Sequence, residues 1–298
     1  MIKNWLEAFR LRTLPLALSC IGMGSFLAAF FGSFNLYVCI LSLTTTLFLQ
    51  ILSNLANDYG DSIHGADGEE REGPKRSVQQ GSITAKAMFH SIIVFAVLSF
   101  LSGLLLLHYS VGIGSTYFYI FVAFGLLAIT AAIAYTNGKK PYGYSGLGDL
   151  SVFLFFGILG VCGTYFLHAK SFQSLLLLPA ASCGFFATGV LNVNNIRDIK
   201  SDQLAGKNSI PVRIGMQKAK VYHYTIIMTG LITAVVFIVL INNYSSLLYI
   251  LPSFILFGQH LMSIHKAANP AEFDPQLKFL ALSTLLFVAL FGLSILDL

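Results

Sequence analysis

The sequence predicts an all-α protein that crosses a membrane about nine times. Of its 298 residues, 56% are hydrophobic and only 10% are Asp, Glu, Lys or Arg, and the mean hydropathy is +0.75. A soluble domain carries about 25% charged residues, so this chain has too few charges to cover a soluble surface. The composition excludes an ordinary soluble enzyme, a disordered chain, a disulfide-linked scaffold and a nucleic-acid-binding protein.

Segments that are long and apolar enough to span a bilayer, which takes about 20 residues, recur along the whole chain. Polar or turn-forming residues separate them, such as Asn242-Asn243 and Asn269-Pro270. We expect a single membrane domain over residues 1–298. The expected spans are 13–33, 36–56, 87–107, 115–134, 147–168, 172–192, 220–241, 246–265 and 277–296.

The basic residues predict how these spans are oriented. With the N-terminus in the cytoplasm, 17 of the 18 Lys and Arg residues fall on the cytoplasmic side, and only Lys170 falls outside. This asymmetry follows the positive-inside rule. The same division places 12 of the 13 Asp and Glu residues inside, which the rule does not require. Most charges lie in the expected loops 57–86 and 193–219, so we expect the functional site there.

A first polar motif lies at the cytoplasmic end of the second span. Asn54, Asn57, Asp58 and Asp61 are spaced i, i+3, i+4 and i+7, which places them on one face of a helix. Asp67 is six residues past the last of these, so it is off that face and is expected in the loop.

A second polar motif lies at the cytoplasmic end of the sixth span, where Asn195, Asp198 and Asp202 share a helical face. Oxygen ligands suit Mg²⁺, which takes one or two carboxylates together with substrate phosphates. Bound Mg²⁺ would make a diphosphate a leaving group. One such motif alone is better explained as capping of helix ends and turns. Two matching motifs at a membrane boundary favour a metal site.

Basic residues near these motifs indicate diphosphate binding. Arg76 follows the first motif, Arg197 lies within the second, and Lys139 and Lys140 follow Tyr135 after the fourth span. Lysine offers diphosphate oxygens a point charge, and arginine offers a fork of donors. Each residue alone is better explained as an ordinary cytoplasmic charge, but the set faces two acidic motifs.

The first motif resembles that of the UbiA superfamily of intramembrane prenyltransferases. The family pattern is Asn-Asp-x-x-Asp-x-x-x-Asp, and Asn57, Asp58 and Asp61 match its first part. Position 65 is glycine, and the next acid is Asp67. The chain therefore departs from the family pattern at the third Asp.

Other stretches extend this resemblance over effectively the whole chain. Asp198 and Asp202 match the second family motif, Asp-x-x-x-Asp, and Tyr135 and Lys139 match a Tyr-x-x-x-Lys element. The run Leu191–Gly215 is similar to the branch that prenylates 1,4-dihydroxy-2-naphthoate, because its Asn-Asn-x-Arg-Asp-x-x-x-Asp is followed by Gly-Lys-Asn. The resemblance implies a UbiA-like bundle around a central cavity, in a bacterial cytoplasmic (inner) membrane.

The resemblance also implies an activity, which is Mg²⁺-dependent transfer of a polyprenyl group from its diphosphate to the naphthoate. The transfer proceeds with loss of CO₂ and is a step of menaquinone biosynthesis. The base for the naphthol hydroxyl is left open between Asp67 and a motif acid. Implied catalytic residues are Asp61, Asp67, Asp198 and Asp202; implied metal ligands are Asn54, Asn57, Asp58, Asp61, Asn195, Asp198 and Asp202; implied substrate-binding residues are Arg12, Arg76, Tyr135, Lys139, Lys140 and Arg197.

Two alternatives stay open at this point. An enzyme of the same family could use another aromatic acceptor, such as 4-hydroxybenzoate or homogentisate. A cation-coupled transporter also carries paired intramembrane carboxylates. The acids of this chain gather at one membrane face rather than at the midplane, and the sequence shows no inverted repeat, both of which disfavour a transporter.

Overall fold

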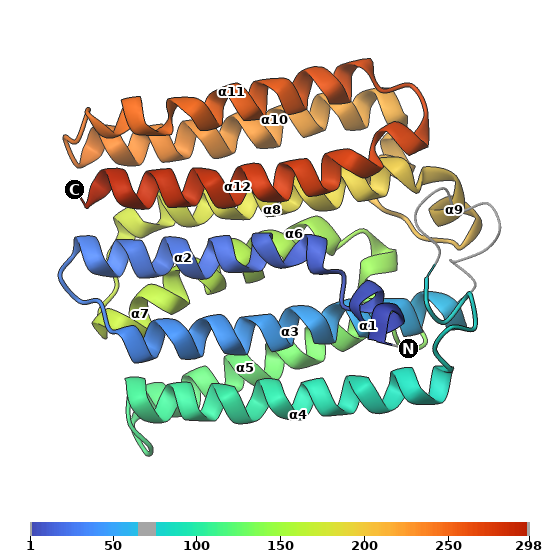
Figure 1. The fold of residues 1–298 in the computed structure, drawn as a ribbon, viewed down its shortest axis with the longest axis horizontal. Helices are drawn as coiled ribbons and strands as arrows, with labels where there is room; N and C mark the ends of the chain where they lie inside the picture. The colour runs from blue at the N-terminus through green and yellow to red at the C-terminus, as the bar shows by residue number, and fades with distance from the viewer. Residues whose placement is uncertain (1, 65–75, 297–298) are drawn as a thin grey trace.

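The computed structural model describes residues 2–64 and 76–296, and over these residues it contains helices and turns but no strand (Figure 1). Nine helical segments of this part are long and apolar enough to cross a membrane, which confirms the predicted fold class. The helices are α1 (Ile2–Ala8), α2 (Leu14–Phe30), α3 (Leu36–Ile63), α4 (Ala85–Ser110), α5 (Thr116–Ala134), α6 (Gly148–Val152), α7 (Thr164–Ala169), α8 (Leu177–Arg197), α9 (Ile199–Leu204), α10 (Ile210–Leu240), α11 (Ser246–Lys266) and α12 (Asp274–Ile295). Shorter helical segments are η1 (Leu11–Thr13), η2 (Tyr142–Ser145), η4 (Ser174–Leu176) and η5 (Pro270–Glu272), and the π-helix η3 (Phe153–Gly163) joins α6 to α7.

Side-chain caps set where three of the spans begin. Asn35 Oδ1, Thr84 Oγ1 and Ser115 Oγ each accept a hydrogen bond from a backbone N–H in the first turn, at 3.2, 3.2 and 3.1 Å. Such caps satisfy donors that a helix N-terminus leaves without a partner. They fix the starts of α3, α4 and α5.

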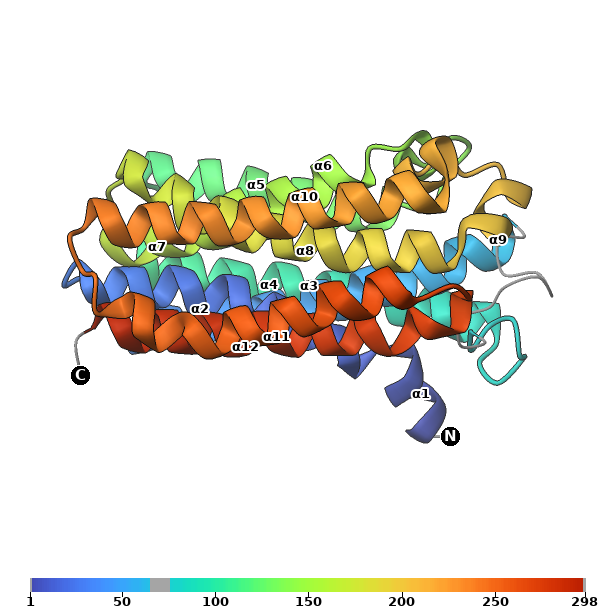
Figure 2. The same ribbon diagram turned by 90° about the horizontal axis from the view of Figure 1, so that it is seen from above.

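The long helices form two packed groups, which lie above and below one another in Figure 1 and overlap when seen from above in Figure 2. The larger apolar cluster joins α2, α8, α10, α11 and α12, and a smaller one joins α1, α3 and α4. Helix α5 packs on α3 and α4 yet has no buried residue. One side of α5 is therefore left to face an internal space between the groups.

The segments that carry the two acidic motifs are more helical than the sequence predicts. The second span continues to Ile63, so the first acidic motif is part of α3. The expected loop 193–219 is wrong in extent, because α8 reaches Arg197, α9 follows at once, and α10 begins at Ile210. A helix can continue beyond the apolar stretch when its polar side chains find partners, as the ion pairs described below show. The chain bends at Gly215, whose φ of 77° suits glycine.

Candidate active site

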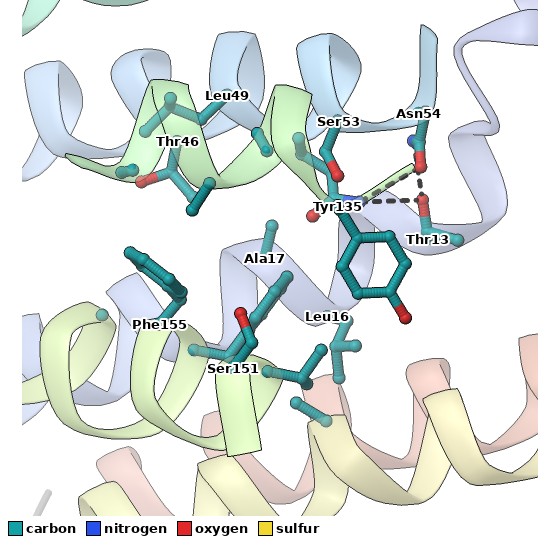
Figure 3. Close-up of a pocket in the computed structure, with 18 of the residues that line it drawn as sticks. Thr13, Leu16, Ala17, Thr46, Leu49, Ser53, Asn54, Tyr135, Ser151 and Phe155 are labelled. Atoms are coloured by element: carbon teal, nitrogen blue, oxygen red, sulfur yellow. Dashed lines mark hydrogen bonds between the residues drawn. The ribbon is translucent and has the colours of Figure 1, made fainter. Parts of the chain in front are cut away.

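A cavity of about 430 Å³ lies between the two helix groups and is lined mainly by α2, α3, α4, α5, η3 and α8. Its polar end carries Asp61 and Asp198, where α3 and α8 finish. Its other end is apolar and includes Phe155 and Leu159 of the π-helix. Figure 3 shows the ring of Tyr135 projecting into this space from the end of α5. A largely apolar pocket with a few convergent polar groups is typical of a ligand-binding site.

The first acidic motif occupies the last turns of α3. Asn54, Asn57 and Asp61 line the cavity, as their spacing predicts. Asp58 is buried but does not line it, and its Oδ2 accepts a hydrogen bond from the Ser77 backbone N–H at 3.3 Å. At about 100° per residue, Asp58 stands at the edge of the shared helical face, and this hydrogen bond holds it outside the cavity. The structure therefore does not bring Asp58 to the expected metal ligands.

The side-chain amide of Asn54 holds the N-terminal segment against α3. Its Nδ2 donates to Phe9 O at 2.9 Å and to Thr13 Oγ1 at 3.1 Å, and Figure 3 shows the contact with Thr13. Gln50 Nε2 donates to its Oδ1 at 3.4 Å. Because both amide atoms have protein partners, the geometry favours a positioning role for Asn54 over direct contact with a metal.

The second acidic motif faces the first from the end of α8 and from α9. Asn195, Asp198 and Asp202 all line the cavity. Arg197 does not line it, and its side chain is fully buried. Its Nε and Nη2 donate to the two carboxylate oxygens of Asp198 at 2.8 and 2.6 Å. Arg197, expected to bind diphosphate, instead orients Asp198, because its guanidinium fork is used on that carboxylate.

An acid at the start of α12 links this pair to the N-terminal segment. Asp274 Oδ1 accepts a hydrogen bond from Arg197 Nη1 at 2.6 Å, and its Oδ2 accepts one from Arg12 Nη1 at 3.1 Å. Arg12 also lines the cavity. The ionic chain from Arg12 through Asp274 and Arg197 to Asp198 couples three helices around one end of the site.

Lys207 stands between the two acidic motifs. Its Nζ lies 3.0 Å from Asp61 Oδ1 and 3.4 Å from Asp202 Oδ1, and it lines the cavity. Asp61 also pairs with Arg76 Nη1 at 2.6 Å and accepts a hydrogen bond from Tyr144 Oη at 2.8 Å. A single ammonium thus occupies the position where one cation contacts both motifs, which shows that the space between them suits a positive charge.

The chemistry of this polar end fits a divalent cation that is shared with a substrate. Within residues 2–64 and 76–296, no three acidic, His or Cys side chains converge as a complete metal cage. Mg²⁺ does not need one, because it takes one or two carboxylates and completes its octahedron with phosphate oxygens and water. Burial, together with the charges of Asp198 and Asp61, raises the pKa of Asp202 to about 6 against the opposing effect of Lys207. A bound cation would relieve this crowding of negative charge.

Tyr135 lines the cavity at the last turn of α5, beside the start of α6. Its hydroxyl lies against Gly148, where a Cβ would come within 2.7 Å of Oη. Burial raises the pKa of Tyr135, and the negative charge of Asp149 raises it further. The phenol therefore stays protonated and is available as a hydrogen-bond donor inside the cavity.

Two lysines that the sequence assigns to diphosphate binding are also not brought to the cavity. Lys139 and Lys140 are exposed and do not line it, because the chain turns outward after α5 through Gly138, whose φ is 102°. Their assignment to diphosphate stays a prediction that this arrangement does not support. Asp67 lies outside the described residues.

Four polar residues of this network are missing from the sequence-based prediction, namely Tyr144, Asp149, Lys207 and Asp274. Lys207 had a signal, since it belongs to the Gly-Lys-Asn run after the second motif. Asp149 and Asp274 had a weaker one, because each is an acid at the start of a span, where ionisable residues are often functional. We find no sequence signal for Tyr144.

Comparison with known proteins assigns the family. The model of the UbiA prenyltransferase family matches residues 17–292, and the chain belongs to this family. It is 43% identical to 1,4-dihydroxy-2-naphthoate octaprenyltransferase of Haemophilus influenzae, over 99% of this chain and 96% of that protein. It is 47% identical to the Escherichia coli protein of the same name, over 78% of this chain and 75% of that protein.

Solved structures share the fold. A UbiA homolog from Archaeoglobus fulgidus bound to DMAPP and Mg²⁺ superposes with a TM-score of 0.63 at 16% identity, covering 99% of both chains. The apo structure of a UbiA homolog from Aeropyrum pernix gives a TM-score of 0.63 at 16% identity, covering 96% of both chains. These similarities confirm the UbiA-like bundle expected from the motifs.

Proposed function

We propose that this protein transfers a polyprenyl group from a polyprenyl diphosphate to 1,4-dihydroxy-2-naphthoate, with loss of CO₂, as a step of menaquinone biosynthesis. The observation that carries the proposal is the similarity to the Haemophilus influenzae octaprenyltransferase, which extends over 99% of the chain at 43% identity. The geometry supports it, because the acids of both motifs meet at one end of an otherwise apolar cavity.

The polar end of the cavity would hold Mg²⁺ and the diphosphate. Asp61, Asp198 and Asp202 are the proposed metal ligands, directly or through water, with Asn57 and Asn195 beside them. Bound Mg²⁺ would supply the neutralisation that makes diphosphate a leaving group. Lys207 and Arg76 already contact Asp61 and would turn their donors to diphosphate oxygens when the substrate and its metal ions arrive.

The apolar end would hold the first part of the prenyl chain. Cleavage of the C–O bond leaves an allylic cation, which must be kept from water. Aromatic faces stabilise a cation, and Tyr135 and Phe155 both line the cavity. Tyr135 would also donate from its neutral hydroxyl to substrate oxygen. These groups are fixed by helix packing before the substrate binds.

The protein is a multi-pass membrane protein. We place it in the bacterial cytoplasmic (inner) membrane, with the N-terminus and both acidic motifs on the cytoplasmic side. The distribution of Lys and Arg supports this orientation, with 17 of 18 residues on that side. The acceptor and the diphosphate are then drawn from the cytoplasmic face and the adjoining leaflet.

Acceptor choice tests the proposal. Purified protein in detergent is offered farnesyl diphosphate, Mg²⁺ and equal amounts of 1,4-dihydroxy-2-naphthoate and 4-hydroxybenzoate, and the products are identified by mass. We expect a prenylated dihydroxynaphthalene that has lost the carboxyl group. Exclusive prenylation of hydroxybenzoate would refute the naphthoate assignment and leave a family enzyme with another acceptor.

A further inference from the structure

The cavity contains a fourth carboxylate, Asp149, that belongs to neither acidic motif. It stands in the first turn of α6, is 8% exposed and lines the cavity. Tyr222 Oη of α10 donates to its Oδ2 at 2.9 Å. Tyr222 does not line the cavity, so it reaches the carboxylate from behind. Asp149 is thus held by a neutral donor on one side and faces the cavity on the other.

Asp149 differs from the other cavity acids in its charge environment. Asp61 is paired with Arg76 and Lys207. Asp198 is paired with Arg197, and Asp202 with Lys207. Asp149, by contrast, has no ion-pair partner among residues 2–64 and 76–296. A carboxylate bound by cations is a poor proton acceptor, because the cations favour its charged form. Asp61, Asp198 and Asp202 are also the proposed metal ligands, and a bound cation would hold each of them in its charged form. Asp149 is therefore the cavity acid that remains available to take a proton.

The position of Asp149 separates it from the diphosphate end. Thr188 Oγ1 lies 3.4 Å from the Asp149 backbone oxygen. Thr188 precedes Asp198 by ten residues on α8, which is about 15 Å along a helix axis. The hydroxyl of Tyr135 is against Gly148, the residue before Asp149, and the charge of Asp149 raises its pKa more than those of Asp61 and Asp202 do. The aromatic acceptor fits the space between the metal end and Asp149.

Apart from the acids of the two motifs, the described residues that line the cavity supply no other base. None of its lining residues is a histidine. Tyr144 donates its hydroxyl proton to Asp61 Oδ1 at 2.8 Å, and burial raises the pKa of Tyr135, so both phenols act as donors. A hydroxyl proton of the acceptor therefore has Asp149 as its nearest unpaired carboxylate within the described part of the cavity.

We propose that Asp149 is the catalytic base that removes the proton from the acceptor's C1 hydroxyl, with Tyr222 as its positioning residue. The inference rests on the proposed function. As C2, which bears the carboxylate, bonds to the allylic carbon, the hydroxyl proton moves to Asp149 and C1 becomes a ketone. The β-keto carboxylate then loses CO₂, and the electrons of the broken C–C bond restore the ring. Asp149 returns its proton to the C1 oxygen, so it ends unchanged.

Two substitutions distinguish this role from a purely structural one. Asp149→Asn keeps an oxygen that can accept from Tyr222 but removes the base. Tyr222→Phe removes the hydrogen bond but keeps the carboxylate. A general base contributes about 10²- to 10⁴-fold to rate. We expect Asp149→Asn to lower kcat about 100-fold or more, with the KM for farnesyl diphosphate within about twofold of wild type. Tyr222→Phe should cost about tenfold or less.

If the hydrogen bond between Tyr222 and Asp149 only holds α10 against α6, the order of the effects is reversed. Turnover is then near normal in Asp149→Asn, and the larger loss is in Tyr222→Phe. That order would overturn the proposal. If Asp149→Asn does not fold, Tyr222→Phe is the test. This variant keeps the carboxylate, so a 100-fold loss of kcat in it would contradict the role of Asp149 as the base. Thermal unfolding in detergent identifies folding failures.

An acceptor analogue distinguishes proton transfer to Asp149 from a packing role of this residue. A ring-halogenated dihydroxynaphthoate has a more acidic hydroxyl and needs its base less. The deficit of Asp149→Asn relative to wild type should shrink with this analogue, and an unchanged deficit would contradict proton transfer to Asp149. Wild-type protein that fails to prenylate dihydroxynaphthoate would refute the proposed function instead, so the two failures are distinguishable.

Discussion

Replacing Lys207 with glutamine removes the one side chain that contacts both acidic motifs in the described part of the cavity. Its Nζ lies 3.0 Å from Asp61 Oδ1 and 3.4 Å from Asp202 Oδ1, and its side chain is 15% exposed. Without substrate, the ammonium compensates the two carboxylates. With substrate, we expect Mg²⁺ to take that place and Lys207 to donate to the diphosphate. The substitution therefore has opposite effects on metal binding and on turnover.

The magnitude follows from the contact that is lost. A hydrogen bond to a charged group contributes about 1.5 to 3 kcal/mol, and tenfold in a constant is about 1.4 kcal/mol. The contact of Lys207 Nζ with Asp202 Oδ1, at 3.4 Å, is too long to add much to this free energy. We expect Lys207→Gln to lower kcat/KM for the prenyl diphosphate about 10- to 150-fold. The same variant should bind divalent cations more tightly when substrate is absent, because a competing cation is gone.

Initial rates at several farnesyl diphosphate concentrations measure the first effect. Binding of Mn²⁺ to the substrate-free protein, followed by electron paramagnetic resonance, measures the second. Lys207→Arg keeps the charge and is the matched control, with a smaller loss in both assays. Turnover of Lys207→Gln within twofold of wild type, or weaker Mn²⁺ binding, would refute the view that Lys207 occupies the cation position between the motifs.

Three further predictions concern the parts that support this site. Gly60→Ala places a Cβ 2.6 Å from the Thr136 backbone oxygen, so we expect a loss of about 1–3 kcal/mol from overpacking, seen as a lower unfolding temperature. Gly103→Ala, whose Cβ meets only Thr45 Cγ2 at 3.7 Å, is the control and should not be destabilised. Asp274→Asn weakens the links to Arg12 and Arg197, and we expect about 1–3 kcal/mol of destabilisation with a lower kcat; unchanged thermal unfolding and kcat would contradict the linking role. Chelation of divalent cations by EDTA should stop product formation and added Mg²⁺ should restore it, whereas activity that persists in EDTA would exclude the metal role.

The sequence predicts the fold well because the bilayer imposes a simple requirement. A span needs about 20 apolar residues and leaves its charges outside, and this pattern gave the spans to within a few residues over most of the chain. The errors lie at the ends of the spans that carry the acidic motifs. Whether α3 stops at position 56 or at Ile63 depends on the partners its polar residues find, such as Arg76 and Tyr144 for Asp61. These partners lie far away in the sequence.

The sequence predicts the cavity-lining residues where helical spacing alone places them. It does not predict them where an ion pair or a hydrogen bond decides which way a side chain points. Asn57, Asp61, Asn195, Asp198 and Asp202 line the cavity as expected. Asp58 and Arg197 are the sequence neighbours of Asn57 and Asp198, yet both are turned away from the cavity. A buried ion pair holds Arg197, and a backbone N–H holds Asp58. Spacing alone does not distinguish a residue that binds substrate from one that orients its neighbour.

Loss of activity on neutralising one acid in each motif tests the central claim, that the two motifs form a single Mg²⁺ and diphosphate site. Purified wild-type protein, Asp61→Asn and Asp198→Asn are assayed with farnesyl diphosphate, 1,4-dihydroxy-2-naphthoate and Mg²⁺, with products identified by mass. We expect Mg²⁺-dependent product from wild type and a loss of at least about 100-fold, or about 2.7 kcal/mol, in each variant. Activity that survives both substitutions would contradict the account.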